Sequence, residues 1–89
     1  MDHQSIKLTD RNGDRYPCNF GSDIIRDGMY LEVTALRQEA VVLLEVFYSD
    51  LTKRLTVSVF EEDVCAELLE QAISVARDRL APKNSHIPN

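Results

Sequence analysis

The segment Ala40–Tyr48, with the sequence AVVLLEVFY, decides the fold. It is the longest apolar run in the chain and is rich in β-branched and aromatic residues, which favour strands. Apolar residues occupy both alternating sets of positions, a pattern typical of a strand in the interior of a sheet. The sequence therefore predicts that this segment is the middle strand of a sheet built from Gly28–Phe60.

The segments on either side of it alternate between apolar and polar residues. With four-residue loops at Arg37–Ala40 and Asp50–Lys53, their apolar residues fall on one face together with one set from the middle strand. Three rows then cross the sheet: Val33 with Leu44 and Val59, Leu31 with Val46 and Val57, and Met29 with Tyr48 and Leu55. A slip by one residue would turn one apolar set to the other face, so this agreement predicts an antiparallel meander.

Residues Gln4–Phe20 are predicted to form a hairpin. A three-residue loop, Arg11–Gly13, with Gly13 in the left-handed conformation, keeps the apolar residues of both strands on one face. The resulting pairs are Leu8 with Tyr16 and Ile6 with Cys18. A two-residue turn at Asn12–Gly13 would instead split the apolar residues between two faces. Because Pro17 has no N–H to donate, its strand is expected to be irregular or at an edge.

From Glu62 or Asp63 to Leu80 the spacing of the apolar residues becomes helical. The apolar stripe consists of Cys65, Leu68, Leu69, Ala72, Ile73, Ala76 and Leu80. Pro82 is expected to end this helix. Glu61, Glu62 and Asp63 suit the start of a helix, with a docking patch for a basic partner as the alternative.

These elements predict one α+β domain over residues 1–82. It is an antiparallel meander of four to five strands with one C-terminal helix packed on one face, in the order β-β-β-β-β-α. The residues from Gly21 to Gly28 are expected to form a polar connection, and residues 83–89, KNSHIPN, a disordered tail.

Composition restricts the classes of function. Ten basic and fifteen acidic side chains give a net charge of −5, which argues against a nucleic-acid partner. The N-terminus lacks the features of a signal peptide, and no apolar run approaches the ~20 residues of a membrane helix. We therefore expect a cytoplasmic protein with no membrane partner. Cys18 and Cys65 are then expected to be free thiols, with a disulfide as the alternative.

The register also places side chains on the sheet face opposite the helix. Its rows are Tyr30 with Phe47 and Thr56, Glu32 with Glu45 and Ser58, and Thr34 with Leu43 and Phe60. Like charges directly across a ladder destabilise it by roughly 0.2–1 kcal/mol, so Glu32 and Glu45 invite an Arg or Lys from a partner. The candidate protein interface consists of Tyr30, Glu32, Val41, Leu43, Glu45, Phe47 and Phe60. The alternative is a half-hydrated surface on which both carboxylates are solvated.

No catalytic, cofactor-binding or metal-binding residue is predicted, and no cofactor is expected. Glu32 and Glu45 lie on an open face without the cleft that acid–base catalysis needs. The segment Asp10–Asp14 resembles a calcium loop only superficially, because its glycine comes too early and the closing position is Gly21. Both cysteines lie among apolar residues and are interpreted as small core residues.

The sequence thus predicts a small non-enzymatic protein-interaction domain, expected to form a homodimer through the sheet face opposite its helix. One alternative is an acidic immunity or antitoxin-type protein that neutralises a basic partner through Glu32 and Glu45. Another is a small-ligand binder or enzyme with a pocket between helix and sheet edge. No family resemblance is specific enough to name.

Overall fold

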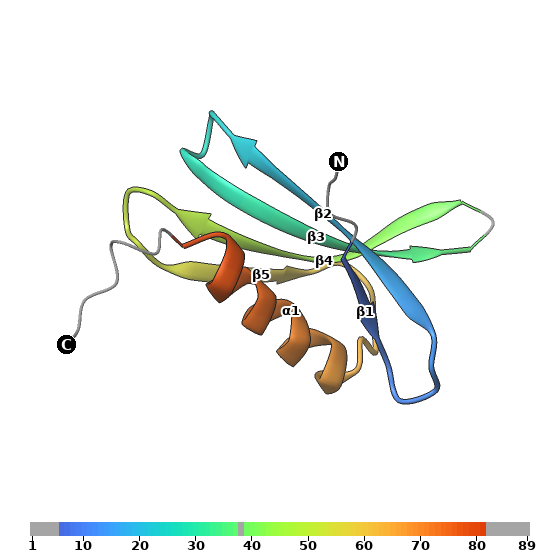
Figure 1. Ribbon diagram of the computed structural model, residues 1–89. Helices are drawn as coiled ribbons and strands as arrows, with labels where there is room; N and C mark the ends of the chain where they lie inside the picture. Colours follow the sequence, from blue (N-terminus) through green and yellow to red (C-terminus); the bar gives the residue numbers. More distant parts are fainter. Residues whose placement is uncertain (1–5, 38, 82–89) are drawn as a thin grey trace.

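Five strands lie side by side in the order in which they follow one another along the chain (Figure 1). The structure is a computed structural model that describes residues 6–37 and 39–81. Its elements are β1 (Lys7–Thr9), β2 (Arg15–Asp23), β3 (Gly28–Leu36), β4 (Ala40–Ser49), β5 (Leu55–Val59) and α1 (Ala66–Arg79). The predicted meander with one C-terminal helix is confirmed. As predicted, β4 is the middle strand of the part built from Gly28–Phe60, with β3 on one side and the edge strand β5 on the other, while β3 is the middle strand of the complete sheet. The tail at residues 83–89 lies outside the described residues.

The predicted register is confirmed for the inner part of the sheet. In the row through the centre of the sheet, Leu44 lies opposite both Val33 and Val59, and the rows through Val46 and Tyr48 are also as expected. At the β1–β2 hairpin, the pair Leu8 with Tyr16 is confirmed, and Gly13 has φ +90°. The alternation of apolar residues, combined with the lengths of the loops, was therefore sufficient to predict these pairings.

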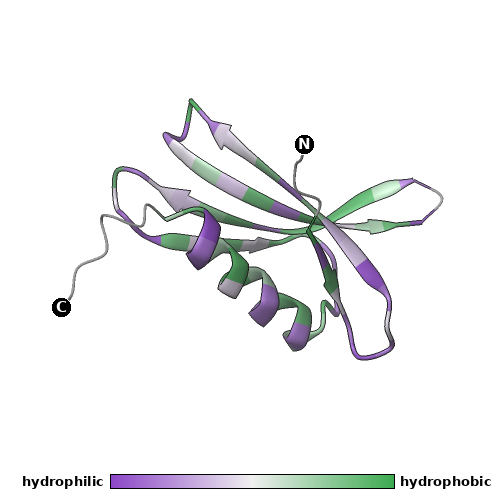
Figure 2. Ribbon diagram, in the orientation of Figure 1, coloured by the Kyte–Doolittle hydropathy of each residue, from purple (hydrophilic) through white to green (hydrophobic). Residues whose placement is uncertain are grey.

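Helix α1 covers the face that carries the predicted apolar rows. Leu68, Ala72 and Ala76 are buried against a sheet core in which Leu31 and Leu44 are fully inaccessible. The two alanines allow the helix backbone to approach the sheet closely. Hydrophobic and hydrophilic residues alternate along the strands, most clearly along β3 (Figure 2). The helix packs mainly against β1, β3 and β4.

The helix begins three residues later than the prediction from Asp63. The first helical residue is Ala66, and Cys65 is the extended N-cap residue with φ −70° and ψ 149°. Asp63 has φ +61°, a left-handed conformation that a helix does not accommodate. Glu61 pairs with Arg37 at 3.3 Å instead of lying in the first helical turn. The acidic run is therefore part of the connection between β5 and α1.

Strand β2 continues through residues that were expected to form a connection. Gly21 pairs with Tyr30 and Asp23 pairs with Gly28, so only residues 24–27 form the turn to β3. The ring of Tyr30 lies over Gly21, where a Cβ atom would come within 2.5 Å of the hydroxyl oxygen. An aromatic ring covering a glycine on the neighbouring strand compensates for the missing side chain, so glycine is accommodated in the ladder.

A β-bulge between Val33 and Thr34 changes the outer part of the β3–β4 pair. Thr34 pairs with Val42 rather than with Leu43, and the strands then pair up to Leu36 with Ala40. The predicted four-residue loop at positions 37–40 is therefore wrong by one residue. The bulge lies where the β2–β3 ladder ends, because the next pair would need an N–H from Pro17. Beyond this point, the β3–β4 hairpin projects past the other strands (Figure 1).

Candidate functional site

Two of the predicted cross-strand pairs are confirmed on the sheet face opposite α1. Glu32 lies opposite Glu45, and Tyr30 lies opposite Phe47. The backbone N–H of Asp50 donates to the carbonyl oxygen of Asp27 at 2.9 Å, so these two residues form a hydrogen-bonded pair. Hydrogen-bonded and non-hydrogen-bonded pairs alternate from there along β3 and β4. By that alternation both predicted pairs are non-hydrogen-bonded, the type in which side chains approach most closely. The two carboxylates are thus placed in an unfavourable arrangement unless a cation neutralises one of them.

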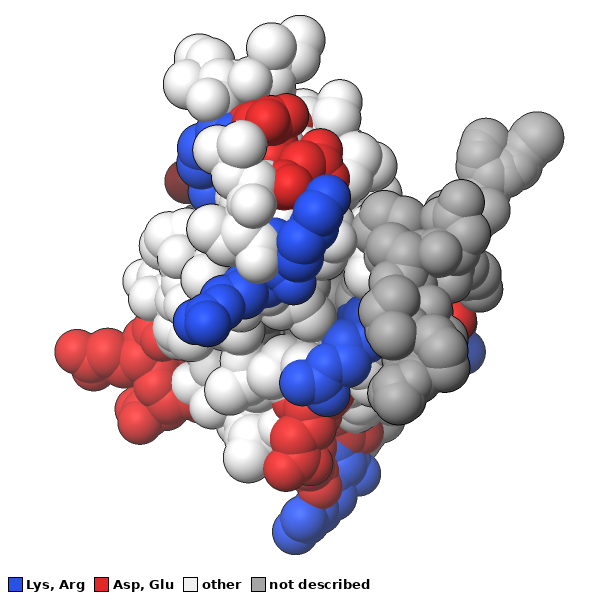
Figure 3. All heavy atoms as spheres, turned by 90° about the vertical axis from the view of Figure 1, so that its left-hand side faces the viewer, with Lys and Arg blue, Asp and Glu red and all other residues white. Residues whose placement is uncertain are grey.

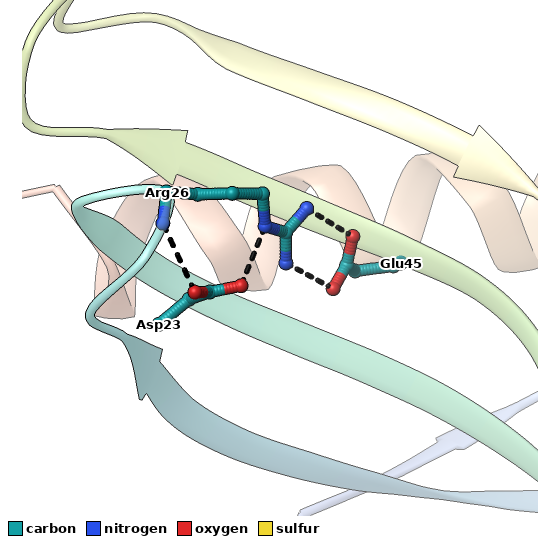
Figure 4. A network of polar contacts seen from close by, with 3 residues as sticks. All are labelled: Asp23, Arg26 and Glu45. Carbon is teal, nitrogen blue, oxygen red and sulfur yellow. Dashed lines mark hydrogen bonds and ion pairs between the residues drawn. The ribbon is translucent and has the colours of Figure 1, made fainter.

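That cation is Arg26, from the turn between β2 and β3 (Figure 4). Its Nη1 donates to Oε1 of Glu45 at 3.0 Å and its Nη2 donates to Oε2 at 2.8 Å. Its Nε donates to Oδ2 of Asp23 at 2.6 Å, while the backbone N–H of Arg26 donates to the other oxygen of Asp23 at 3.0 Å. The sequence analysis expected an Arg or Lys from a partner, but this chain supplies the arginine itself.

The hydrogen bonds of this network shift the pKa values of Arg26 and Asp23. The hydrogen bonds that Arg26 donates to Glu45 and Asp23 raise the pKa of Arg26, while the backbone and side-chain hydrogen bonds from Arg26 lower the pKa of Asp23. Arg26 and Asp23 are therefore held in their charged forms. Since the side chain of Glu45 is only 12 % exposed, its carboxylate is largely committed to this contact.

Phe47 is covered by the same arginine. The guanidinium carbon of Arg26 lies 4.1 Å from the centroid of the ring, within the range of a cation–π contact. The tip of the ring also reaches over Gly28, where a Cβ atom would lie 2.5 Å from it. Phe47 is 8 % exposed as a result. Phe47, which the sequence analysis assigned to the candidate interface, is therefore covered by residues of its own chain.

Two other residues of the predicted interface lie on the helix side. Leu43 is 4 % exposed and belongs to the core, and Val41 packs against that core. The bulge explains both positions. Leu43 is the extra residue that β4 inserts beside Leu44, and from there toward Ala40 the residues of β4 lie on the face opposite to the predicted one, so Val41 lies on the helix side. Of the seven predicted residues, only Phe60 is exposed, at 59 %, while Tyr30, Glu32, Val41 and Glu45 are half-buried.

The sequence analysis missed the apolar surface beside β5. Val57 and Val59 face the helix side of the sheet, yet they are 38 % and 49 % exposed. The helix packs mainly over β1, β3 and β4 and leaves them uncovered. Together with Phe60 they form what we call the β5 surface: Val57, Val59 and Phe60. A sequence signal existed, since LTVSV has no charge, proline or glycine to protect an edge strand.

A second group of exposed apolar residues lies at the turns. Ile24 and Ile25 in the β2–β3 turn and Leu51 in the β4–β5 turn are all exposed. The hydrogen bond from Asp50 to Asp27 joins these two turns at one end of the sheet. Figure 3 views the molecule from this end, where basic and acidic side chains are interspersed among uncharged ones. This end of the molecule therefore has no surface patch of purely positive or purely negative charge.

The two thiols are free but differ in environment. Cys18 is buried, and desolvation raises its pKa to about 11. Cys65 is exposed at the start of α1 and does not belong to the core, contrary to the expectation. It lines a surface hollow of about 400 Å³ together with the Asp10–Asn12 turn and Glu67. Arg11 and Glu67 form an ion pair of 2.7 Å across this hollow, so its charged groups already bind each other.

The turn beside this hollow is a self-contained unit. One oxygen of Asp10 accepts hydrogen bonds from the backbone N–H groups of Asn12 and Asp14 at 2.9 and 3.0 Å. The other accepts the hydroxyl of Tyr16 at 2.7 Å, which raises the pKa of Tyr16 to about 12 and lowers the pKa of Asp10. These contacts explain the DRNGD segment as a turn.

Three further searches give no assignment. Within residues 6–37 and 39–81, no helix has the length and apolar character needed to cross a membrane. The same part of the chain contains no cluster of three or more side chains suited to hold a metal ion. Comparison with protein-family models, with characterised proteins and with solved structures finds no match to this chain. The function must therefore be argued from the surfaces described above.

Proposed function

We propose that the chain is a non-enzymatic protein-interaction domain that associates with a second copy of itself through the β5 surface. The observation that carries this proposal is the uncovered apolar edge strand: Val57, Val59 and Phe60 are exposed beside a strand that pairs on one side only. Natural sheets usually protect such edges with charges, prolines or bulges, and β5 has none within its five residues. A second copy would cover both the side chains and the free backbone groups.

This proposal moves the contact away from the sheet face opposite α1. On that face Arg26 covers Phe47 and neutralises Glu45, so the face has little unsatisfied polar or apolar surface at its centre. Phe60 is shared by the two surfaces, because it lies at the end of β5 and is exposed. The predicted homodimer is thus kept, with a different contact strand.

The two alternative functions gain less support. A protein that neutralises a basic partner would rely on Glu32 and Glu45, but both oxygens of Glu45 are already bound by Arg26. A ligand binder would need convergent polar groups in an enclosed site. Thr34 is a buried polar residue, and its hydroxyl donates to the carbonyl of Pro17 at 3.2 Å. It is satisfied and has no free group for a ligand.

The proposal is tested by the solution mass over a wide range of concentrations, measured by sedimentation. We expect a dimer that dissociates on dilution. Val57→Lys should shift the equilibrium to monomer with an unchanged circular dichroism spectrum, because the edge would carry a charge facing its own copy. Ile25→Lys is the matched control, since it charges an exposed aliphatic residue outside the β5 surface. A monomer at all concentrations would contradict self-association, and a dimer that Val57→Lys leaves intact would contradict the β5 surface.

A further inference from the structure

The free edge of β5 has a defined set of backbone groups. At the two ends of the β4–β5 pair, Phe60 N donates to Leu43 O at 2.8 Å and Ser49 N donates to Arg54 O at 3.0 Å. Antiparallel strands alternate between bonded and non-bonded pairs, so the even-numbered residues of β5 bond to β4. The odd-numbered residues direct their N–H and C=O groups to the free edge. They are Leu55, Val57 and Val59.

We infer that β5 pairs antiparallel with β5 of a second copy, with the two-fold axis passing between the two Val57 residues. The inference rests on the proposed function, because it specifies the geometry of the self-association. In this register Val57 faces Val57, and Leu55 faces Val59 of the second copy. Every outward N–H and C=O group of the three residues then has a partner. The two five-stranded sheets become one continuous sheet.

Other registers satisfy fewer of these groups. A shift by two residues in one direction would place Val59 opposite Lys53, and in the other direction it would place Leu55 opposite Glu61. Both Lys53 and Glu61 lie outside the strand, and Lys53 has φ +62°. A shift by one residue would place apolar positions opposite the polar positions Thr56 and Ser58. The register centred on Val57 is therefore favoured by both the backbone and the side chains.

The charges that flank β5 identify a second copy as the partner. Lys53 and Arg54 precede the strand, and Glu61, Glu62 and Asp63 follow it. An antiparallel pair places the basic end of each strand beside the acidic end of the other, and the symmetry repeats the contact twice. Opposite charges across a ladder are stabilising, and complementary charges also set the orientation of an interface. Glu62 and Asp63 are exposed and available for it.

The helix extends the same apolar surface. Its flank toward β1 is polar, since Nε2 of Gln71 donates to the carbonyl of Thr9 at 2.7 Å and Glu67 binds Arg11. Leu69 and Ile73 lie on the opposite flank by helical geometry and are half-buried. This flank is directed toward the β5 side of the sheet, on the face where Val57 and Val59 are uncovered. Two copies related by the inferred axis would bring both flanks to the same side of the joined sheet.

Disulfide cross-linking tests the register directly. In the inferred dimer, Thr56 lies opposite Ser58 of the second copy in a non-hydrogen-bonded pair with Cα atoms about 4.5 Å apart. A disulfide spans Cα atoms roughly 4.4–6.8 Å apart, so Thr56→Cys in one copy should bridge to Ser58→Cys in the other. Two copies of the same variant would hold their cysteines about 8 Å apart, which is too far. Each variant is made with Cys65→Ser, because Cys65 is exposed, and Cys18 is protected by burial.

We expect covalent dimer, under mild oxidation, in the mixture of the two variants and not in either variant alone. Cross-linking of Thr56→Cys alone or of Ser58→Cys alone would overturn the register, because it would place the axis at Thr56 or Ser58. A dimeric mass without any cross-link would overturn the β5–β5 pairing and leave self-association standing. A monomer at every concentration would overturn both the pairing and the proposed function.

Amide hydrogen exchange gives a second test on the unsubstituted protein. The N–H groups of Leu55, Val57 and Val59 should exchange slowly at high concentration and rapidly on dilution. The amides of Thr56 and Ser58 are the internal control, because they bond to β4 in the monomer and should be protected at both concentrations. Rapid exchange of the three edge amides in a sample with dimeric mass would overturn the inferred pairing.

Discussion

Arg26 holds Glu45 through two parallel hydrogen bonds, from Nη1 at 3.0 Å and from Nη2 at 2.8 Å. The two residues are 19 positions apart, and the contact passes over the ring of Phe47. It resolves the conflict between Glu32 and Glu45, which face each other across β3 and β4. A feature that suggested an external basic partner is thus explained by an arginine of the same chain.

We expect Arg26→Lys to lower the free energy of unfolding by about 1 kcal/mol, because lysine retains the charge but cannot form the two-pronged contact. In a double-mutant cycle with Arg26→Ala and Glu45→Ala, the coupling energy should be about 0.5–1 kcal/mol, since Arg26 is 43 % exposed and partly screened. Urea unfolding at low and high salt measures both effects. A coupling energy near zero at low salt would show that the contact has no role in stability.

Two glycines that lie beneath aromatic rings should respond differently to alanine. A Cβ atom at Gly28 would collide with the backbone carbonyl oxygen of Tyr48, which cannot move without disturbing β4. Gly28→Ala should therefore destabilise the protein by about 1–3 kcal/mol or more. At Gly21 the obstacle is the end of the Tyr30 side chain, which can swing away. Gly21→Ala is the matched variant and should cost less, because the Tyr30 side chain can make room, whereas the restriction of the unfolded chain by alanine is the same for both variants. Thermal unfolding of both variants compares them, and equal losses would contradict this account.

Leu43 and Phe60 were both predicted to lie in an interface, but they should behave in opposite ways. Leu43→Ala removes a buried core side chain and should lower the free energy of unfolding by about 2–5 kcal/mol. Phe60→Ala removes an exposed ring and should change the stability of the monomer by less than about 0.5 kcal/mol. Denaturant unfolding at a concentration below dimer dissociation makes the comparison. A large loss for Phe60→Ala under that condition would mean that its ring packs within the monomer.

The two cysteines should differ in reactivity. At pH 8 a thiol reagent should modify Cys65 rapidly and Cys18 only after unfolding, because burial raises the pKa of Cys18 and blocks access. Rapid reaction of both thiols in the folded protein would contradict the burial of Cys18.

The same burial predicts a pH dependence at alkaline pH. The pKa of Cys18 rises from 9.0 in the unfolded chain to about 11 in the folded one. The unfolded state therefore loses this proton first, so the stabilising contribution is fully present below pH 9 and is lost as pH rises toward 11. Cys18→Ala should remove the part of the loss of stability above pH 9 that comes from this thiol. If the free energy of unfolding of the variant has the same pH profile, the loss of stability is due to other groups.

The sequence by itself determined the order of the elements and most of the strand register. Alternation along a strand has a period of two, so a shift by one residue would turn the apolar residues away from the buried face, and the short loops select among the registers that remain. This local rule predicted the three rows through Leu44, Val46 and Tyr48, together with the left-handed Gly13. It also predicted that Glu32 and Glu45 face each other. These features depend on neighbours within one sheet.

The tertiary structure decided which of these residues are accessible. A helix is about 10 Å across and strands lie about 4.8 Å apart, so one helix covers two or three strands and leaves others bare. Val57 and Val59 are exposed for this reason, although their pattern marks them as inward-facing. The bulge beside Val33 turned Leu43 into the core, and the turn brought Arg26 over Phe47. The periodicity of one segment does not show which strands the helix covers, where a bulge interrupts the pairing or which residue a side chain from a turn contacts. These features depend on how separate segments meet in space.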